Sequence, residues 1–145
     1  MSAPVLMLYD GLCGFCNSSV QWLLKRDKFD RFRFAPQQST LAGDVLLRHG
    51  IDRQAMLKSN SVYLVMDLGS SSERLLQRSD VTVQALLSLG GKWKLLGYCL
   101  RMLPRFIRDA GYTLVAQNRY RLSGRYDVCP IPTAGERAKF LGLTD

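Results

Sequence analysis

The stretch VLMLYDGLCGFC, residues 5–16, determines the fold expected for this chain. Its first five residues form a short apolar run that is typical of a buried strand. Asp10 and Gly11 follow, and this pair favours a tight turn. From residue 13 to about residue 28, apolar side chains recur at helical spacing, and the positive charges of 25–28 suit the end of a helix. The stretch therefore predicts a strand that turns directly into a helix, with Cys13 and Cys16 at the junction.

The rest of the first 91 residues predicts further elements in alternation. We expect strands at 32–35, 61–67 and 74–78, and helices at 40–49 and 79–89. The two strands at 61–67 and 74–78 can pair as an antiparallel hairpin across a serine-rich loop. The resulting order is β-α-β-α-β-β-α, with a CxxC motif after the first strand. This combination predicts an α/β fold with a thioredoxin-like core over residues 1–91.

Residues 92–145 are expected to form a basic helical extension and tail that packs on this core within one structural domain. Apolar residues recur at helical spacing between Leu95 and Ala110, and Cys99 lies on that stripe, where we expect it to be buried. Pro104 should divide the stretch into two helices. A last short helix is expected at about residues 135–141.

Composition and charge exclude several classes of protein. With 145 residues, 47% hydrophobic and 22% charged, the chain has the make-up of an ordinary globular protein and not of a disordered or collagen-like one. The net charge of +8 is concentrated after residue 90, where ten Lys or Arg face four Asp or Glu. This basic third is either a solvated face or a surface for an acidic partner or an anionic membrane. Nucleic-acid binding is disfavoured, because basic and aromatic residues mix on many ordinary helices.

The sequence predicts a cytoplasmic location. Every window of roughly 20 residues carries charge, which is unlike a membrane-spanning helix. Residues 1–4 carry no basic side chain, and the apolar run 5–9 is too short for a signal peptide. Because stable structural disulfides are rare in the cytoplasm, a CxxC motif there favours redox or metal chemistry.

Cys13 and Cys16 have the spacing of a redox pair. Residues three apart on a helix lie about 5–6 Å from each other, which suits a disulfide. The start of a helix also stabilises a thiolate. Cys16 shares a face with Val20 and Leu24 and should point inward, whereas Cys13 should be accessible. We therefore expect Cys13 to attack a substrate disulfide, and Cys16 to resolve the mixed disulfide.

Other interpretations of the motif remain open. A four-ligand zinc site would need all the remaining soft ligands, Cys99, Cys129 and His49, to converge on the pair. A purely structural CxxC is the second alternative. Haem attachment is excluded because Asn17, not histidine, follows the motif. No glycine-rich nucleotide motif is present, so we expect no bound cofactor, and electrons should come from another protein or a small thiol. Because there is no second CxxC, we also expect no metal.

The stretch YDGLCGFCN, residues 9–17, resembles the DCC family of thiol-disulfide oxidoreductases, whose hallmark is an aspartate followed by CxxC after the first strand. FRFAPQ at 32–37 and NRYRLSGRY at 118–126, continued by Cys129 and Pro130, extend the resemblance over most of the chain. It implies a thioredoxin-like fold and dithiol chemistry at Cys13 and Cys16.

Three further residues are candidates for the site. We expect Gly11 to permit the turn and Asp10 to accept N–H bonds from the loop, although both could be ordinary turn residues. Cys129, within the family-like block, is either a third thiol that exchanges with the pair or a small buried residue. The sequence departs from thioredoxins at 57–61, where it has no proline facing the motif.

Overall fold

A mixed four-stranded sheet in the order β2-β1-β3-β4 forms the centre of the protein. The strands are β1 (Val5–Tyr9), β2 (Phe32–Pro36), β3 (Tyr63–Met66) and β4 (Arg74–Gln77). β1 runs parallel to β2 and antiparallel to β3, and β3 pairs with β4 as an antiparallel hairpin. The computed structural model describes residues 5–10, 14–28, 30–37, 39–52, 54–55, 62–123 and 139–140.

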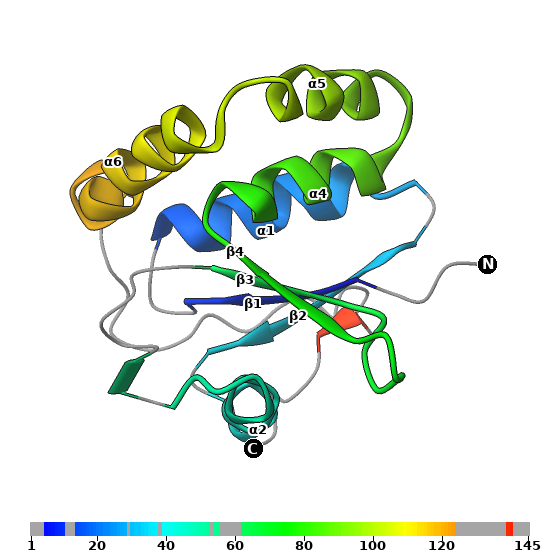
Figure 1. Cartoon of the computed structure of the whole chain (residues 1–145), viewed down its shortest axis with the longest axis vertical. Helices are drawn as coiled ribbons and strands as arrows, with labels where there is room; N and C mark the ends of the chain where they lie inside the picture. The colour runs from blue at the N-terminus through cyan, green and yellow to red at the C-terminus, as the bar shows by residue number, and fades with distance from the viewer. Residues whose placement is uncertain are drawn as a thin grey trace.

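Helices cover both faces of this sheet (Figure 1). α1 (Gly14–Arg26) and α4 (Ser79–Leu89) lie on one face, and α2 (Thr40–Arg48) lies on the other. Residues of β1 alternate between the two layers, as strand geometry requires. Val5, Met7 and Tyr9 pack with α1 and α4, whereas Leu6 and Leu8 pack with α2. Every residue of β1 is therefore buried, and this explains its unbroken apolar sequence.

The protein thus has the predicted α/β, thioredoxin-like fold. The element order β-α-β-α-β-β-α and the hairpin of β3 and β4 are both confirmed. Ser39 caps α2 by accepting a hydrogen bond from the Ala42 N–H at 3.2 Å. The buried carboxylate of Asp27 fixes the connection from α1 to β2, because it accepts N–H bonds from Arg31 and Phe32.

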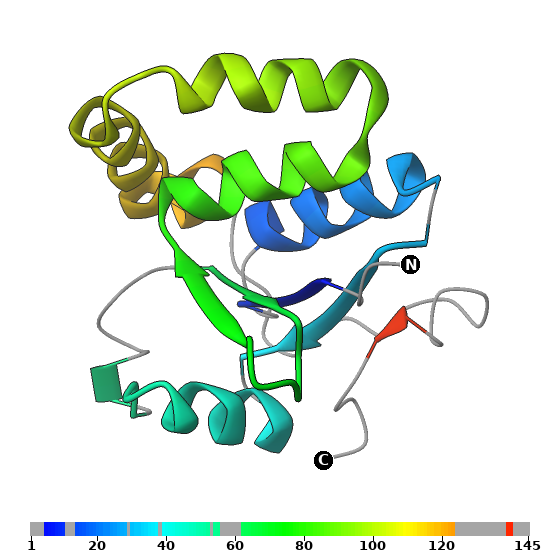
Figure 2. The same ribbon diagram turned by 45° about the vertical axis from the view of Figure 1, so that its right-hand side comes forward.

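The C-terminal extension forms an outer helical layer of α5 (Gly91–Arg101) and α6 (Arg105–Ser123), separated at Pro104 as predicted. α5 lies over α4 (Figure 2). Gly97 is the buried residue of α5, and a Cβ there would lie 3.0 Å from Leu87 Cδ2. The prediction that Cys99 is buried was wrong: its side chain is exposed. The close approach at Gly97, rather than the apolar stripe, determines which face of α5 packs.

A pair of tryptophans adds a second contact of this layer. Trp93 of α5 meets Trp22 of α1 edge to face with ring centroids 4.8 Å apart, and the Arg26 guanidinium lies 4.2 Å from the Trp22 centroid. Such aromatic and cation–π contacts each contribute about 0.5–1.5 kcal/mol. They fix the start of α5 to the end of α1.

Polar contacts attach α6 to the core. Arg108 pairs with Asp80 of α4 at 3.3 Å, and Asp109 accepts a hydrogen bond from the Ser79 hydroxyl. Tyr112 Oη accepts a hydrogen bond from the Val62 N–H beside β3 at 3.0 Å. α6 is thus held at points along one side, while apolar residues elsewhere on it stay exposed.

Only a small part of the C-terminal tail is described. Phe140 forms an isolated bridge with Phe34 of β2, and their rings lie 5.5 Å apart. Lys139 pairs with Asp30 at 3.2 Å. The rest of the short helix expected at 135–141 lies outside the described residues, and the division into a core of 1–91 and an extension stays a prediction.

Candidate active site

The site is built where β1 passes into α1. β1 ends at Tyr9, and Asp10 follows it as a buried residue, 6% exposed. α1 begins at Gly14, so Cys16 lies in its first turn. Cys16 is 4% exposed and belongs to the same buried cluster as Val20 and Met7. Its thiol is therefore enclosed by the core at the start of a helix.

Gly11, Cys13 and Cys129 lie outside the described residues. The roles expected for them, and for Asp10 and Cys16, remain predictions. What the described residues establish is the place of the second cysteine of the motif: Cys16 faces the interior of the α1 and α4 layer. A thiol in this position is shielded from solvent on the side of the core.

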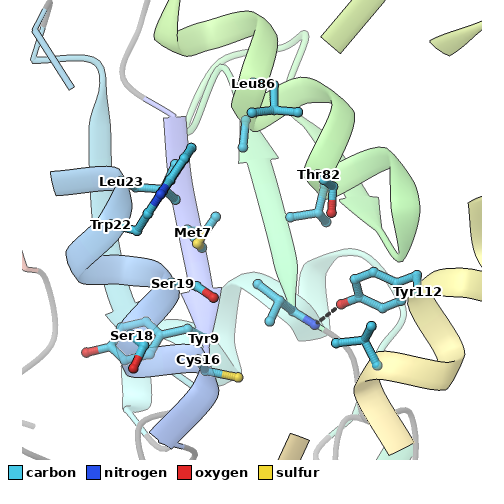
Figure 3. Close-up of a pocket in the computed structure, with 14 residues that line it drawn as sticks. Met7, Tyr9, Cys16, Ser18, Ser19, Trp22, Leu23, Thr82, Leu86 and Tyr112 are labelled. Atoms are coloured by element: carbon cyan, nitrogen blue, oxygen red, sulfur yellow. Dashed lines mark hydrogen bonds between the residues drawn. The ribbon is translucent and has the colours of Figure 1, made fainter. Parts of the chain in front are cut away.

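A pocket of about 390 Å³ adjoins Cys16 (Figure 3). It lies between α1, α4 and α6 above β1 and β3. Apolar and small side chains make up most of its wall: Met7, Tyr9, Cys16, Ser18, Ser19, Trp22, Leu23, Val62, Val81, Thr82, Ala85, Leu86, Tyr112 and Val115. Figure 3 shows Cys16 directed from α1 toward the side of the pocket where Tyr112 lies. The volume is within the range of small-ligand sites, about 300–1,000 Å³.

No charged side chain is present among the described residues that line this pocket. The Tyr112 hydroxyl is turned to the Val62 backbone N–H, and the hydrogen bond is drawn in Figure 3. Ser18 and Thr82 are exposed at the rim, whereas Met7 and Leu23 are buried in the floor. The pocket therefore offers an apolar interior that is reached from a small polar rim.

One carboxylate with a lowered pKa, Glu73, lies away from this pocket. The Gly69 N–H bond and the His49 and Arg48 side chains lower the pKa of Glu73, against the opposing effect of burial. His49 Nε2 lies 2.7 Å from Glu73 Oε1 and Arg48 lies 3.0 Å from Oε2. This cluster joins the end of α2 to the loop before β4, so it stabilises the opposite face of the sheet.

The described residues do not bring the ligands of a zinc site together. His49 follows α2 on one face of the sheet, while Cys16 lies beneath α4 on the other. Cys99 is exposed on α5. Within the described ranges, no three His, Cys, Asp or Glu side chains are grouped as metal ligands. A four-ligand site that combines Cys16 with His49 is therefore excluded by their placement.

Sequence reasoning did not identify the pocket. Its walls come from four elements, β1, α1, α4 and α6, and from Val62 just before β3, which meet only in the folded chain. One local signal was present: Ser18 and Ser19 follow Cys16 on α1, and Ser19 lies one turn further on nearly the same face. Small side chains beside an inward-facing cysteine leave space unfilled. The small side chain of Thr82 leaves space in the same way on α4.

The chain is similar to one known protein family and to two known proteins. The model of the DCC1-like thiol-disulfide oxidoreductase family matches residues 7–125. The chain is 26% identical over 141 residues to the uncharacterized protein YuxK of Bacillus subtilis, covering 94% of this chain and 93% of that protein. It is 32% identical over 126 residues to a chloroplastic DCC family protein of Arabidopsis thaliana, covering 87% and 69%. No solved structure matches the chain.

Proposed function

The chain belongs to the DCC1-like thiol-disulfide oxidoreductase family, and on that premise we propose that it exchanges disulfides with Cys13 as nucleophile and Cys16 as resolving thiol. The observation that carries this proposal is the position of Cys16, which is buried in the first turn of α1 directly after β1. We expect Cys13, three residues earlier in the sequence, to come within disulfide-forming range of Cys16.

The proposed reaction has two exchange steps. The Cys13 thiolate attacks one sulfur of a substrate disulfide, forms a mixed disulfide and releases the other substrate half as a thiolate, which takes a proton from water. The Cys16 thiol gives its proton to solvent, and the resulting thiolate attacks the Cys13 sulfur. A Cys13–Cys16 disulfide forms, and the second substrate half leaves as a thiolate that takes a proton from water. Two electrons have then passed from the protein to the substrate.

Asp10 and Gly11 are proposed to shape the loop that presents Cys13. Asp10 is buried at the end of β1, so its carboxyl group must satisfy its hydrogen bonds within the protein. Cys129 is proposed as a third thiol that exchanges with the pair. Peptide mapping of the oxidised protein should recover a Cys129 crosslink to Cys13 or Cys16, and an oxidised protein with no such peptide would refute the exchange.

The substrate is proposed to be a protein or small-molecule disulfide, and the location cytoplasmic. In the part of the chain that the structure describes, no helix has the length and apolar character needed to cross a membrane. The relative from Arabidopsis is named as chloroplastic, so fractionation of cells that express the tagged chain is the direct measurement of location. Recovery inside an organelle would contradict the cytoplasmic proposal.

Three variants, each with one cysteine replaced by serine, test the exchange reaction. Turnover of a small disulfide should be lost in Cys13→Ser, while Cys16→Ser should accumulate a mixed disulfide that a reductant releases. Cys99→Ser is the matched control, since Cys99 is exposed on α5 and should leave turnover unchanged. Wild-type turnover in Cys13→Ser would refute the proposal.

A second candidate function rests on a different observation, the exposed apolar surface of α5 and the start of α6. We define the α5–α6 surface by seven exposed residues: Leu95, Leu96, Tyr98, Met102, Leu103, Phe106 and Ile107. Residues 91–123 contain seven Lys or Arg and one acidic residue, Asp109. Exposed apolar side chains beside unbalanced positive charge match the interface of an anionic bilayer. We propose this surface as a peripheral contact with anionic membranes.

Vesicle binding discriminates this candidate. The protein should cosediment with anionic vesicles, less so as salt rises, and Phe106→Ser with Met102→Ser should weaken binding at least tenfold. Leu47→Ser is the control, because Leu47 is also an exposed apolar residue, at 64%, but lies on α2. Absence of pelleting, or equal loss in the control, would refute membrane contact.

A further inference from the structure

We propose that the pocket between α1, α4 and α6 receives a bulky apolar side chain next to the half-cystine of a peptide substrate. This inference rests on the proposed function and adds the class of substrate to it. Its foundation is the place of Cys16, which forms part of the pocket wall.

The second exchange step requires the substrate to lie next to this pocket. When Cys16 resolves the mixed disulfide, its sulfur must reach bonding distance of the Cys13 sulfur, to which the substrate is still attached. Because Cys16 lines the pocket, the substrate is then held at the pocket's edge whatever path it took to Cys13. Side chains close to the substrate's half-cystine are therefore the groups that can enter.

The lining selects the chemistry of the group that enters. Met7, Trp22, Leu23 and Leu86 present aliphatic, thioether and aromatic surface. A charged group would lose its hydration there without gaining a partner of opposite charge among the described lining residues. Burial of apolar surface, in contrast, favours binding roughly in proportion to the area covered. The fitting group is a large aliphatic or aromatic side chain.

Other hollows of the described surface have a different character, which makes the choice specific. The hollow between the end of α1 and the start of α5 is lined by Lys25, Arg26, Lys28 and Lys92. A third, on the outer side of α6, includes Arg78 and Asp109. Neither includes a cysteine among its described residues, so the apolar pocket is distinguished by both its lining and its thiol.

The attachment of α6 keeps the pocket open. α6 is fixed to α4 through Asp109 and Ser79, and beside β3 through Tyr112 and Val62. Tyr112 and Val62 are themselves part of the pocket wall, whereas Ser79 and Asp109 are not among its lining residues, so the two contacts hold the α6 wall in place. Val115, one turn after Tyr112, lines the rim and is 40% exposed, so it is placed to contact an incoming group.

Two matched peptides test the selectivity. Each carries one cysteine as a mixed disulfide with 2-mercaptoethanol, and the neighbouring residue is Phe in one and Ser in the other. The reduced wild-type protein should react with the Phe peptide at least about tenfold faster in kcat/KM, since hydrophobic pockets discriminate on that scale. A ratio near one would overturn the proposal.

Variants that fill the pocket test whether the preference for the Phe peptide arises there. Val115→Trp should reduce the Phe/Ser ratio toward one, and Thr82→Trp should do the same from the opposite wall. Val115 and Thr82 are both exposed, so the fold should tolerate a tryptophan side chain at either position. Leu114→Trp is the matched control: Leu114 is exposed on α6 but lies on the hollow with Arg78, and its ratio should equal that of wild type. Equal ratios in Val115→Trp, Thr82→Trp and Leu114→Trp would overturn the proposal.

A binding measurement separates this inference from the exchange reaction itself. Peptides in which serine replaces the cysteine are titrated into protein with ¹³C-labelled methionine methyl groups. The Phe peptide should shift the buried Met7 methyl in the pocket and leave Met102, 86% exposed on the α5–α6 surface, unmoved. A Met7 shift without turnover refutes exchange and supports the pocket. Turnover without a Met7 shift, or a shift at Met102 alone, overturns the pocket and leaves exchange intact.

Discussion

β1 and α5 are both rich in apolar residues, yet they have opposite surroundings. All five residues of β1 are buried, because helices cover the sheet on both faces. In α5 the buried residue is Gly97, while Leu95 is 67% exposed. Apolar periodicity therefore predicts burial only where a partner surface exists on that side. An outer helix packs instead through the residue that allows the closest approach.

The candidate site lies between the buried core and the outer helical layer. Cys16 belongs to the covered layer of α1 and α4, and the pocket beside it is closed on its outer side by α6. The core thus positions the thiol, and the outer layer forms the wall where a substrate would be selected. Substitutions in the two regions should have correspondingly different effects on stability.

The largest difference is expected for two phenylalanines. Phe34 of β2 is fully buried, so Phe34→Ala should cost about 3–5 kcal/mol in free energy of unfolding. Phe106 of α6 is 74% exposed, and Phe106→Ala should change it by about 0.5 kcal/mol or less. Urea unfolding measures both. Similar costs for the two variants would mean that the outer layer is packed as tightly as the core.

Two helical glycines sharpen the account of how α5 packs. At Gly97 a new Cβ would meet Leu87 Cδ2 at 3.0 Å and Leu86 Cβ at 3.2 Å, so Gly97→Ala should destabilise the protein by about 1–3 kcal/mol. At Gly111 of α6 a Cβ meets nothing within 4 Å, and Gly111→Ala should stabilise it by up to about 1 kcal/mol. A shift of the same sign in both thermal unfolding curves would contradict this packing.

Tyr112 tests the attachment of α6. Tyr112→Phe removes the acceptor of the Val62 N–H bond and should cost about 0.5–1.5 kcal/mol. Faster hydrogen exchange at the Val62 amide should accompany the loss. Exchange at Leu64, within β3, serves as the internal control. If exchange at Val62 did not change, α6 would be held by other contacts.

A smaller change in the free energy of unfolding is expected when the pH is lowered. The hydrogen bond from the Ser79 hydroxyl lowers the pKa of Asp109 below its ordinary value. The ionised carboxylate thus favours the folded state, and this contribution is present above about pH 4 and is lost as the pH falls below it. The pH dependence of unfolding should therefore be shallower in Asp109→Asn between about pH 5 and pH 3. If the free energy of unfolding depended on pH equally in Asp109→Asn and wild type, ionised Asp109 would not stabilise the folded state.

The sequence was sufficient to predict the core and the two helices of the outer layer, but not which face of that layer packs. Val5–Tyr9, the hairpin and the inward side of Cys16 could be predicted because strand and helix periods assign each residue to a face. Cys99 was misplaced because the stripe that contains it has no covering partner. The pocket could not be predicted, since its walls depend on the spacing of α1, α4 and α6, which Tyr112 and Asp109 set through contacts distant in sequence.

A redox titration tests the central claim most directly. The purified protein is equilibrated in graded dithiol and disulfide buffers, free thiols are trapped with a mass tag, and tagged peptides are identified. Cys13 and Cys16 should lose their tags together with a single midpoint, while the exposed Cys99 stays tagged. Independent loss of the two tags, or tags that are blocked until a chelator is added, would contradict a dithiol–disulfide couple at the start of α1.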